Sequence, residues 1–155
     1  MSFNPWSEKT KVFDIIPAEQ LSKEKAEAVV DVKETNRNFF YRLAKTAYYN
    51  KVESISAPQV GINKRFLVYR STEGRWVAMY NPSIIHLQGE QALRWEKCCS
   101  YPGKNMQKSR INRATIQFWN HEGKMLTKTF HNIELAYILH EMEHMDGTTW
   151  YKEQL

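Results

Sequence analysis

Two histidines near the end of the chain stand at a spacing that suits metal chemistry. The segment reads His140-Glu141-Met142-Glu143-His144. Helical residues four apart lie on one face, one turn apart, so both imidazoles can bind one metal ion. Glu141 lies about 100° around such a helix from His140, where its carboxylate can exchange protons with a metal-bound water. The pattern predicts a hydrolytic metal site.

A catalytic site of this type normally has three protein ligands and one open position. Only eleven residues follow His144, so an upstream third ligand is favoured. The candidates are His86, His121, His131, Cys98, Cys99 and a carboxylate. A thiolate would suit Fe(II), Zn(II), Ni(II) or Co(II). The alternative for the adjacent cysteines is a buried, inert pair, since neighbouring residues close no useful disulfide loop.

The histidine pair requires a helix, which we expect from about Asn132 to Asp146 with Gly147 as its C-terminal stop. Apolar residues surround nearly its whole circumference, which predicts a helix buried within the fold. The alternative is that the two histidines lie on the protein surface, but the apolar residues around them argue against it. A second, long helix is predicted from about Ser22 to Asn50, with Ser22 as its cap and one apolar face.

Short extended stretches separated by turns fill the middle of the chain. They span 65–70, 75–80, 84–87, 91–98, 114–119 and 124–130, with Asn81-Pro82 ending the second. Consecutive strands with tight turns favour antiparallel pairing. The expected fold is therefore α+β: antiparallel β-sheets packed around a central buried helix that carries HExxH, plus a long N-terminal helix, in one domain over residues 1–155.

Composition limits the class of protein. The 155 residues are 42% hydrophobic and 13% aromatic, enough for a packed core, with net charge +5. No apolar run approaches the ~18 residues of a membrane span, and the N-terminus has no secretory pattern, which predicts a cytoplasmic protein without a membrane partner. Basic residues gather at Lys104, Lys108, Arg110 and Arg113. We interpret them as a solvated loop or edge strand; the alternative is long-range attraction to ribosomal RNA.

Three segments together resemble the peptide deformylase family, metallohydrolases that remove the formyl group from nascent chains. The family motifs are G-x-G-[apolar]-A-A-P-Q, E-G-C-[apolar]-S and Q-H-E-x-x-H. Here residues 52–59 read VESISAPQ, residues 96–100 read EKCCS, and residues 139–144 read LHEMEH. Order and separation match the family. The short C-terminus resembles that of phage or viral members, which implies a host or bacterial cytoplasm.

The resemblance implies a role for each matching residue. Cys98, His140 and His144 would bind one divalent ion per chain, Fe(II) natively, with Zn(II), Ni(II) or Co(II) as substitutes. Glu141 would be the general base and then the general acid. The Gln59 amide and the backbone N–H of Cys99 would donate to the formyl oxygen. The substrate would be an N-formylmethionyl nascent peptide, met during a transient ribosome contact without specific nucleic-acid binding.

Substrate-binding residues are expected on both sides of an added peptide strand. Glu53 and Ser54 would lie along one side and Lys97 along the other. Ile133 and Tyr137, about two turns and one turn before His140 on its helix face, would line the methionine pocket.

The chain departs from the family motifs at several positions. Val52 and Ser54 replace both glycines of the first motif, which reduces backbone freedom. Lys97 replaces the glycine of the second motif and adds a cation, and Cys99 replaces its apolar residue. Leu139 replaces a glutamine. Because of these changes we consider three hypotheses: a deformylase with altered specificity, a metallopeptidase that cleaves internal amides, and a non-catalytic metal-binding relative.

Overall fold

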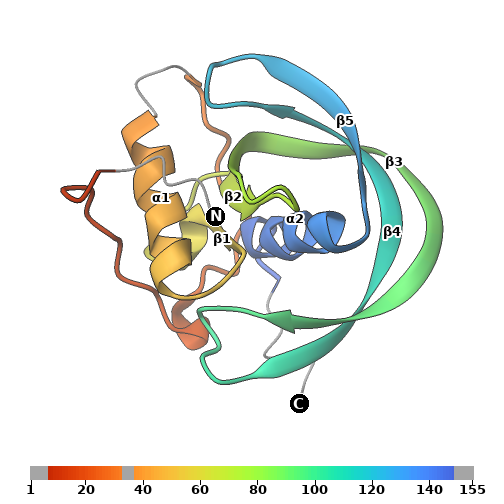
Figure 1. Ribbon diagram of the computed structural model, residues 1–155, viewed down its shortest axis with the longest axis horizontal. Helices are drawn as coiled ribbons and strands as arrows, with labels where there is room; N and C mark the ends of the chain where they lie inside the picture. Colours follow the sequence, from red (N-terminus) through yellow and green to blue (C-terminus); the bar gives the residue numbers. More distant parts are fainter. Residues whose placement is uncertain (1–6, 33–36, 149–155) are drawn as a thin grey trace.

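The computed structural model describes residues 7–32 and 37–148, which form a curved sheet with helices against it (Figure 1). Five strands pair in the order β1-β2-β3-β4-β5, and every pairing is antiparallel. The strands are β1 (Ser54–Ser56), β2 (Phe66–Arg70), β3 (Trp76–Lys97), β4 (Asn105–Trp119) and β5 (Met125–His131). There are also two short 3-10 helices among the described residues: η1 (Ala18–Gln20) precedes α1, and η3 (Ala57–Val60) follows β1. The mixed helical and antiparallel class is thus confirmed, with one sheet.

β3 is longer than predicted. The stretches 75–80, 84–87 and 91–98 merge into one strand, and Asn81-Pro82 does not end it. Register shifts between Tyr80 and Ser83, Ile84 and His86, and Gln88 and Gln91 absorb the irregular residues. Such bulges bend a strand without ending its pairing. β3 and β4 therefore curve together around α2 in Figure 1.

The first helix is shorter than predicted. α1 spans Arg37–Tyr49, whereas residues 22–32 are not helical, and residues 33–36 of the predicted helix lie outside the described residues. The backbone N–H groups of Ala26 and Glu27 donate to the carbonyls of Met145 and Asn63, so they bond to distant segments. The Ser22 hydroxyl accepts a bond from the Glu24 N–H in a local turn instead of capping a helix.

The second helix, α2 (Asn132–Met145), confirms the prediction for the C-terminal element. It lies within the concave side of the sheet in Figure 1. Gly147 follows it with φ +80°, and a Cβ there would collide with the Lys23 carbonyl, so glycine is required. Neither described helix has the length and apolar run that a membrane crossing requires.

The two faces of β2 separate two apolar clusters. Leu67 and Tyr69 pack with α2, while Phe66 and Val68 pack with α1. Side chains alternate between the faces of a strand, so this five-residue strand anchors both helices. The sheet thereby fixes the position of α2, on which the predicted ligands lie.

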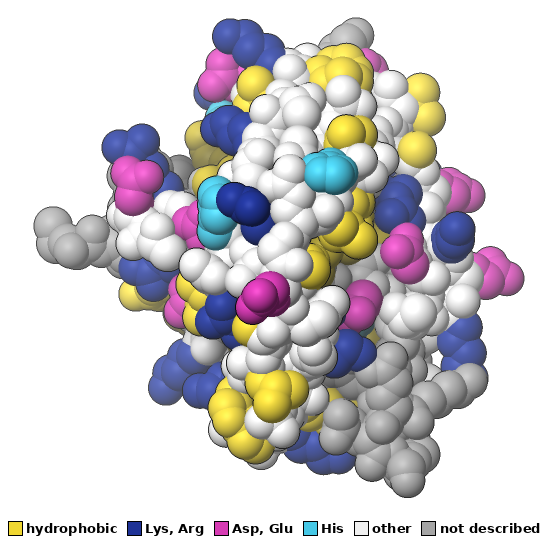
Figure 2. All heavy atoms as spheres, turned by 90° about the vertical axis from the view of Figure 1, so that its right-hand side faces the viewer, with side chains coloured by type: hydrophobic (Ala, Val, Ile, Leu, Met, Phe, Trp, Pro, Cys, Tyr) yellow, Lys and Arg dark blue, Asp and Glu magenta, His cyan; other side chains and the backbone are white. Residues whose placement is uncertain are grey.

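The outer face of the sheet is more mixed (Figure 2). Hydrophobic side chains there lie among Lys, Arg and acidic side chains. β3 exposes the large apolar residues Ile84, Ile85, Leu87, Leu93 and Trp95. The apolar cluster that includes α2 lies on the opposite, concave side of β3 and β4.

Candidate metal centre and active site

Three donor atoms converge at the C-terminal half of α2. His140 Nε2 and His144 Nε2 lie 3.1 Å apart, and Cys98 Sγ lies 3.4 Å from His144 Nε2. The four-residue spacing on α2 aligns the two rings, and the chain just after β3 supplies the sulfur. All three side chains are buried, and their donor atoms fall within 4.8 Å of one another. In the described part of the chain, no other set of three or more His, Cys, Asp or Glu side chains brings its donor atoms together in this way.

The chemistry of these donors fits a divalent metal ion. Burial, and next the negative charge of Glu141, raise the pKa of the Cys98 thiol well above its usual value. Burial lowers the pKa of His144 well below its usual value, and no described group bonds to its Nδ1. Neutral imidazoles are ready ligands, and a bound cation reverses the penalty on a buried thiolate. Two nitrogens and one sulfur suit Fe(II), Zn(II), Ni(II) or Co(II).

A buried ion-pair network orients His140. Its Nδ1 lies 3.0 Å from Glu96 Oε1, which leaves Nε2 directed at the cluster. Arg110 donates two 2.9 Å hydrogen bonds to Glu96 and lies 2.9 Å from Glu143. Burial raises the pKa of Glu96, but the hydrogen bonds from Arg110 and His140 outweigh it, so the pKa lies below the usual value.

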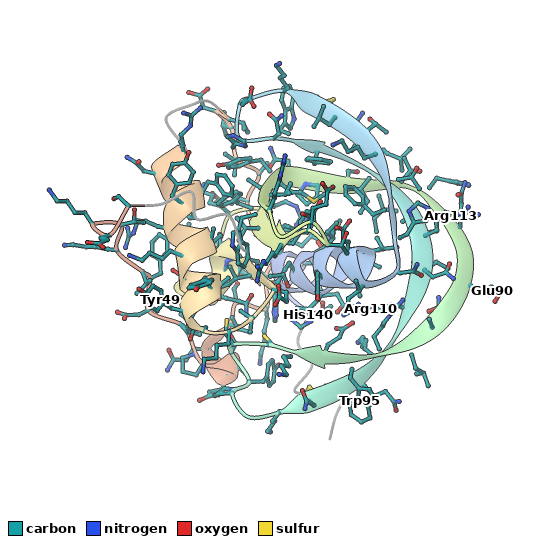
Figure 3. The ribbon with its side chains drawn as sticks, in the orientation of Figure 1. Tyr49, Glu90, Trp95, Arg110, Arg113 and His140 are labelled. Atoms are coloured by element: carbon teal, nitrogen blue, oxygen red, sulfur yellow. The ribbon has the colours of Figure 1, made fainter. Side chains whose placement is uncertain are left out.

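Arg110 corrects one sequence interpretation. The sequence predicts a solvated loop or edge strand for the four basic residues, yet they belong to β4 and its preceding turn, and Arg110 is only 5% exposed. Figure 3 shows Arg110 directed toward α2 near His140, whereas Arg113 projects from the outer curve. Met106, Arg110 and Ala114 are buried at even positions of β4. That alternation could have revealed the inward direction of Arg110.

Glu141 places a second carboxylate beside the cluster, and among the described residues Arg110 bonds to other carboxylates. Its Oε2 accepts a 2.7 Å hydrogen bond from the Ser54 hydroxyl and lies 4.0 Å from His140 Nε2. Its Oε1 is buried and has no hydrogen-bond partner among the described residues. Burial raises the pKa of Glu141 above its usual value. A carboxylate with one free oxygen and a raised pKa beside a metal site is suited to proton transfer.

Gln59 reaches the cluster from the other side. Its amide nitrogen lies 3.1 Å from Cys98 Sγ and 3.2 Å from Ser100 Oγ. Its amide oxygen accepts a bond from the Ser56 N–H, within a capping box at the start of η3. The amide N–H groups are thereby aimed at the donor cluster. Ser56 stands where the family motif has an alanine, and sequence reasoning missed this contact.

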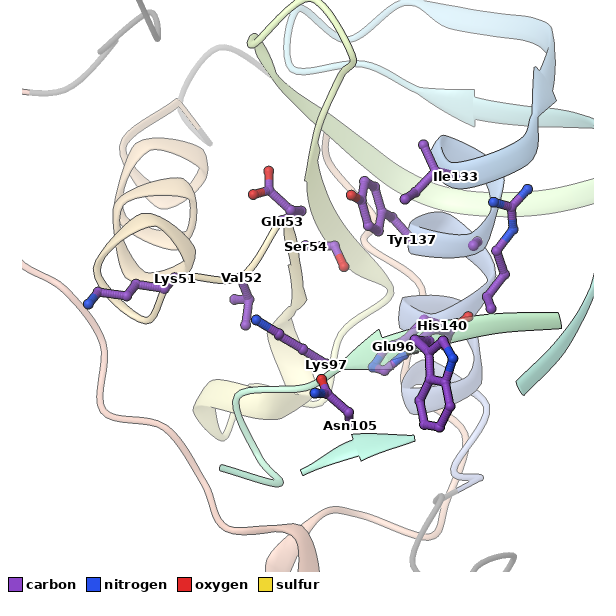
Figure 4. A pocket seen from close by; sticks show the side chains of 13 residues that line it. Lys51, Val52, Glu53, Ser54, Glu96, Lys97, Asn105, Ile133, Tyr137 and His140 are labelled. Carbon is purple, nitrogen blue, oxygen red and sulfur yellow. Dashed lines mark hydrogen bonds and ion pairs between the residues drawn. The ribbon is translucent and has the colours of Figure 1, made fainter. Parts of the chain in front are cut away.

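A cavity of about 420 Å³ opens beside His140 (Figure 4). All five side chains that we expect to bind substrate line this cavity: Glu53, Ser54, Lys97, Ile133 and Tyr137. Sequence reasoning missed several others in its lining, namely Lys51, Arg94, Trp95, Asn105 and Ala136. β1 pairs with β2 alone among the strands, which leaves one of its edges unpaired. An extended peptide could bind along that edge.

Comparison with known proteins identifies the fold and the family. The family model for polypeptide deformylase matches residues 14–154. The chain belongs to the polypeptide deformylase family. It is 28% identical to a peptide deformylase of Desulforudis audaxviator, over 92% of this chain and 98% of that protein. It is 30% identical to one from Fusobacterium nucleatum, covering 83% and 72% of the two chains.

Solved structures share this fold. The crystal structure of peptide deformylase from Thermotoga maritima has a TM-score of 0.85, 24% identity, and coverage of 91% of this chain and 96% of that one. A Synechococcus elongatus peptide deformylase in complex with actinonin has a TM-score of 0.84, 23% identity, and coverage of 96% and 81%. The family acts as a hydrolase that removes the formyl group from nascent peptides, which is the function expected of this chain.

Cys99 lies beside the cluster without joining it. Its side chain is half-buried, and burial raises its pKa to about 12. Its sulfur lies 3.4 Å from the Gln59 amide nitrogen. Since Cys98 alone groups with the two histidines, the structure distinguishes two cysteines that the sequence could separate only by motif register.

Proposed function

We propose that this chain hydrolyses the N-formyl group of N-formylmethionyl nascent peptides at the Cys98, His140 and His144 centre. The single observation that carries this is the convergence of those three donors beside the buried Glu141 carboxylate, at the end of an open cavity. We propose one divalent ion per chain, Fe(II) natively, with Ni(II), Co(II) or Zn(II) as substitutes. When bound, such an ion supplies Lewis acidity and lowers the pKa of a coordinated water.

The peptide binds as an added strand along β1. Its backbone pairs with the unpaired edge at Glu53 and Ser54 and faces Lys97 across the cavity. The methionine side chain fills the apolar part of the cavity formed by Ile133, Ala136 and Tyr137. The formyl group then lies next to His140, which lines the cavity and belongs to the donor cluster.

Glu141 moves the proton. Its free Oε1 accepts a proton from the attacking water, whose oxygen bonds to the formyl carbon. The same carboxyl then donates the proton to the amide nitrogen as the carbon–nitrogen bond breaks. The products are formate and a peptide with a free amino terminus. Ser54 holds the other oxygen, Oε2, and fixes the orientation of the carboxylate.

Gln59 and Cys99 stabilise the oxygen that becomes negative during attack. The Gln59 amide and the backbone N–H of Cys99 donate to it, and each such donor contributes about 3 kcal/mol to transition-state stability. The capping box that holds the Gln59 carbonyl keeps its N–H groups in place before substrate binds. Pre-orientation of this kind avoids reorganisation during the reaction.

Formate release from formyl-Met-Ala-Ser tests the proposal. Protein loaded with Fe(II) without oxygen, or with Ni(II) or Co(II), should release formate, and actinonin should inhibit it. Glu141→Gln should retain the metal while turnover falls by about 10²–10⁴-fold. Absence of turnover with all three metals would contradict the proposal, and full activity of Glu141→Gln would contradict the role of that residue.

Unformylated Met-Ala-Ser and an internal-amide peptide separate the alternatives. Cleavage of these would favour a metallopeptidase, and metal binding without any turnover would favour a non-catalytic relative. We propose further that the chain acts as one deformylase-like domain in the cytoplasm, where translation supplies formylated chains. Contact with the ribosome is proposed as transient and electrostatic, without a specific nucleic-acid interface.

A further inference from the structure

A second cavity of about 370 Å³ continues from the first. The two share four lining residues: Lys51, Val52, Lys97 and Asn105. In Figure 4 the Lys97 side chain extends toward Val52, where the two cavities meet. Together the cavities form one groove, whose lining includes His140 in the first cavity and Cys98 in the second.

The second cavity is strongly cationic. Its charged lining side chains are Lys51, Lys97 and Lys104, and it has no Asp or Glu among its lining residues. All three lysines are exposed, and within residues 7–32 and 37–148 none of them forms an ion pair. Three amines around one hollow produce a positive potential that attracts an anionic group.

The nearby carboxylates do not neutralise this potential. Glu96 is buried and bonded to Arg110 and His140. Glu53 lines the first cavity but not the second, and its carboxylate lies 4.0 Å from Arg70. Arg94 adds a further cation to the first cavity. The second cavity is therefore more positive than the first, whose lining also includes Glu53 and Glu96.

A peptide bound as the proposed function requires must enter this cationic region. Its first residue occupies the first cavity, and its chain follows the β1 edge from Ser54 back past Val52. An extended chain advances about 3.3 Å per residue, so the second to fourth residues pass between Lys51 and Lys97. Carboxylate side chains at these positions would face unpaired ammonium groups.

We propose that this groove selects formylated peptides with acidic residues at the second to fourth positions. This inference rests on the proposed function and adds the substrate class. Lys51 and Lys97 are the central specificity residues because both cavities include them, and Lys97 replaces a glycine of the family motif. Exposed ion pairs are individually weak, so selectivity arises from several lysines acting together.

The test compares kcat/KM for three peptides: formyl-Met-Ala-Asp-Glu, formyl-Met-Ala-Ser-Gln and formyl-Met-Ala-Lys-Lys, all amidated at the C-terminus. At low ionic strength we expect the acidic peptide to exceed the basic one by about tenfold, since each exposed pair contributes a factor of about 1.5 to 5. In 0.5 M salt the ratio should fall toward about twofold, because screening shortens the range of surface charges.

The variant Lys51→Asn/Lys97→Gln/Lys104→Gln should reduce the ratio to about one. Asn is chosen at position 51 because Lys51 has φ +57°, which asparagine tolerates. Lys128→Gln is the matched control, since Lys128 is exposed on β5, which lines neither cavity. It should retain the wild-type ratio.

The outcomes separate the two proposals. Equal kcat/KM for the three peptides, or an unchanged ratio in the triple variant, would overturn the acidic preference and leave deformylation intact. Absence of turnover of every formylated peptide would overturn the proposed function and this inference with it. A ratio that falls equally in Lys128→Gln would assign the preference to net charge and not to the groove.

Discussion

Side chains around His140 are buried and bonded to one another, whereas Lys51 and Lys97 in the same cavity lining are exposed and form no ion pair with any described residue. Glu96, Cys98 and His144 are all less than 10% exposed, while Lys51 and Lys97 face solvent. The family-motif residues that this chain keeps include the three donors, Gln59 and Glu96, and all are buried. Chemistry requires fixed donor positions, so substitutions there are costly.

The departures from the family motifs include no donor: Lys97 is exposed, whereas Ser54 and Cys99 are half-buried and Val52 is buried. Val52, Ser54 and Lys97 line the cavity, and Cys99 is half-buried beside it. Cavity walls can change without moving the donors, because the helix spacing and the ion-pair network set the donor positions. The comparison teaches that this chain keeps the buried motif residues of the family and differs from the family motifs in the walls of the cavity.

The largest expected effect separates the two adjacent cysteines. Cys98→Ala removes a donor, so metal content after dialysis should fall from one ion per chain to near zero. Turnover should fall by more than the 10–100-fold typical of an outer partner of a metal ligand. Cys99→Ala is the matched control and should retain the metal, since its sulfur lies outside the cluster. Equal metal loss in both variants, measured by elemental analysis, would contradict the assignment.

Disruption of the ion-pair network should affect stability next most strongly. Arg110→Met leaves Glu96 buried without its cation, which should lower the free energy of unfolding by about 3–5 kcal/mol. The double variant Glu96→Gln/Arg110→Met should lose less, because no unpaired charge remains buried. Urea denaturation at fixed metal concentration measures both.

The single variant Glu96→Gln tests the orientation of His140. Metal affinity of Glu96→Gln should fall by about 10–100-fold, because the hydrogen bond to His140 Nδ1 is weakened. A double variant less stable than Arg110→Met, or an unchanged metal affinity, would show that the network does not support the centre.

Ser54 connects the two regions, since it lines the cavity and bonds to Glu141. Ser54→Ala should lower kcat by about fivefold, corresponding to the roughly 1 kcal/mol of one hydrogen bond, with little change in KM. Ser54→Thr retains a hydroxyl and should restore most of kcat. A change in KM alone would assign Ser54 to the peptide-binding region and not to the positioning of Glu141.

Local patterns made the centre predictable. The His140 and His144 spacing is a property of a single helix, and the resemblance supplied Cys98 and Gln59. Contacts between segments that are distant in the sequence could not be predicted in the same way. Residues 22–32 are not helical because their N–H groups bond to distant carbonyls, and β3 continues because bulges absorb Asn81 and Pro82. Arg110 bonds to Glu96 across two strands, a relation that requires the register.

The smallest expected effect lies outside both regions and provides a reference for them. His121, in the turn between β4 and β5, packs against Phe40 with ring centroids 5.1 Å apart. Burial lowers its pKa, an effect partly opposed by Glu122, so the unfolded chain binds this proton more readily than the folded one. Stability should therefore fall as pH drops through about 6.5, the unfolded value, and level off below the folded pKa.

His121→Asn removes this proton uptake. Between pH 7.5 and 5, the variant should lose a few tenths of a kcal/mol less unfolding free energy than the wild type, a small amount because the side chain is partly exposed. Urea denaturation of both proteins at several pH values measures the difference, and any acid effect on the metal centre cancels between them. Identical pH dependence would show that His121 binds its proton equally in both states, and the acid sensitivity of the fold would then belong to the buried centre.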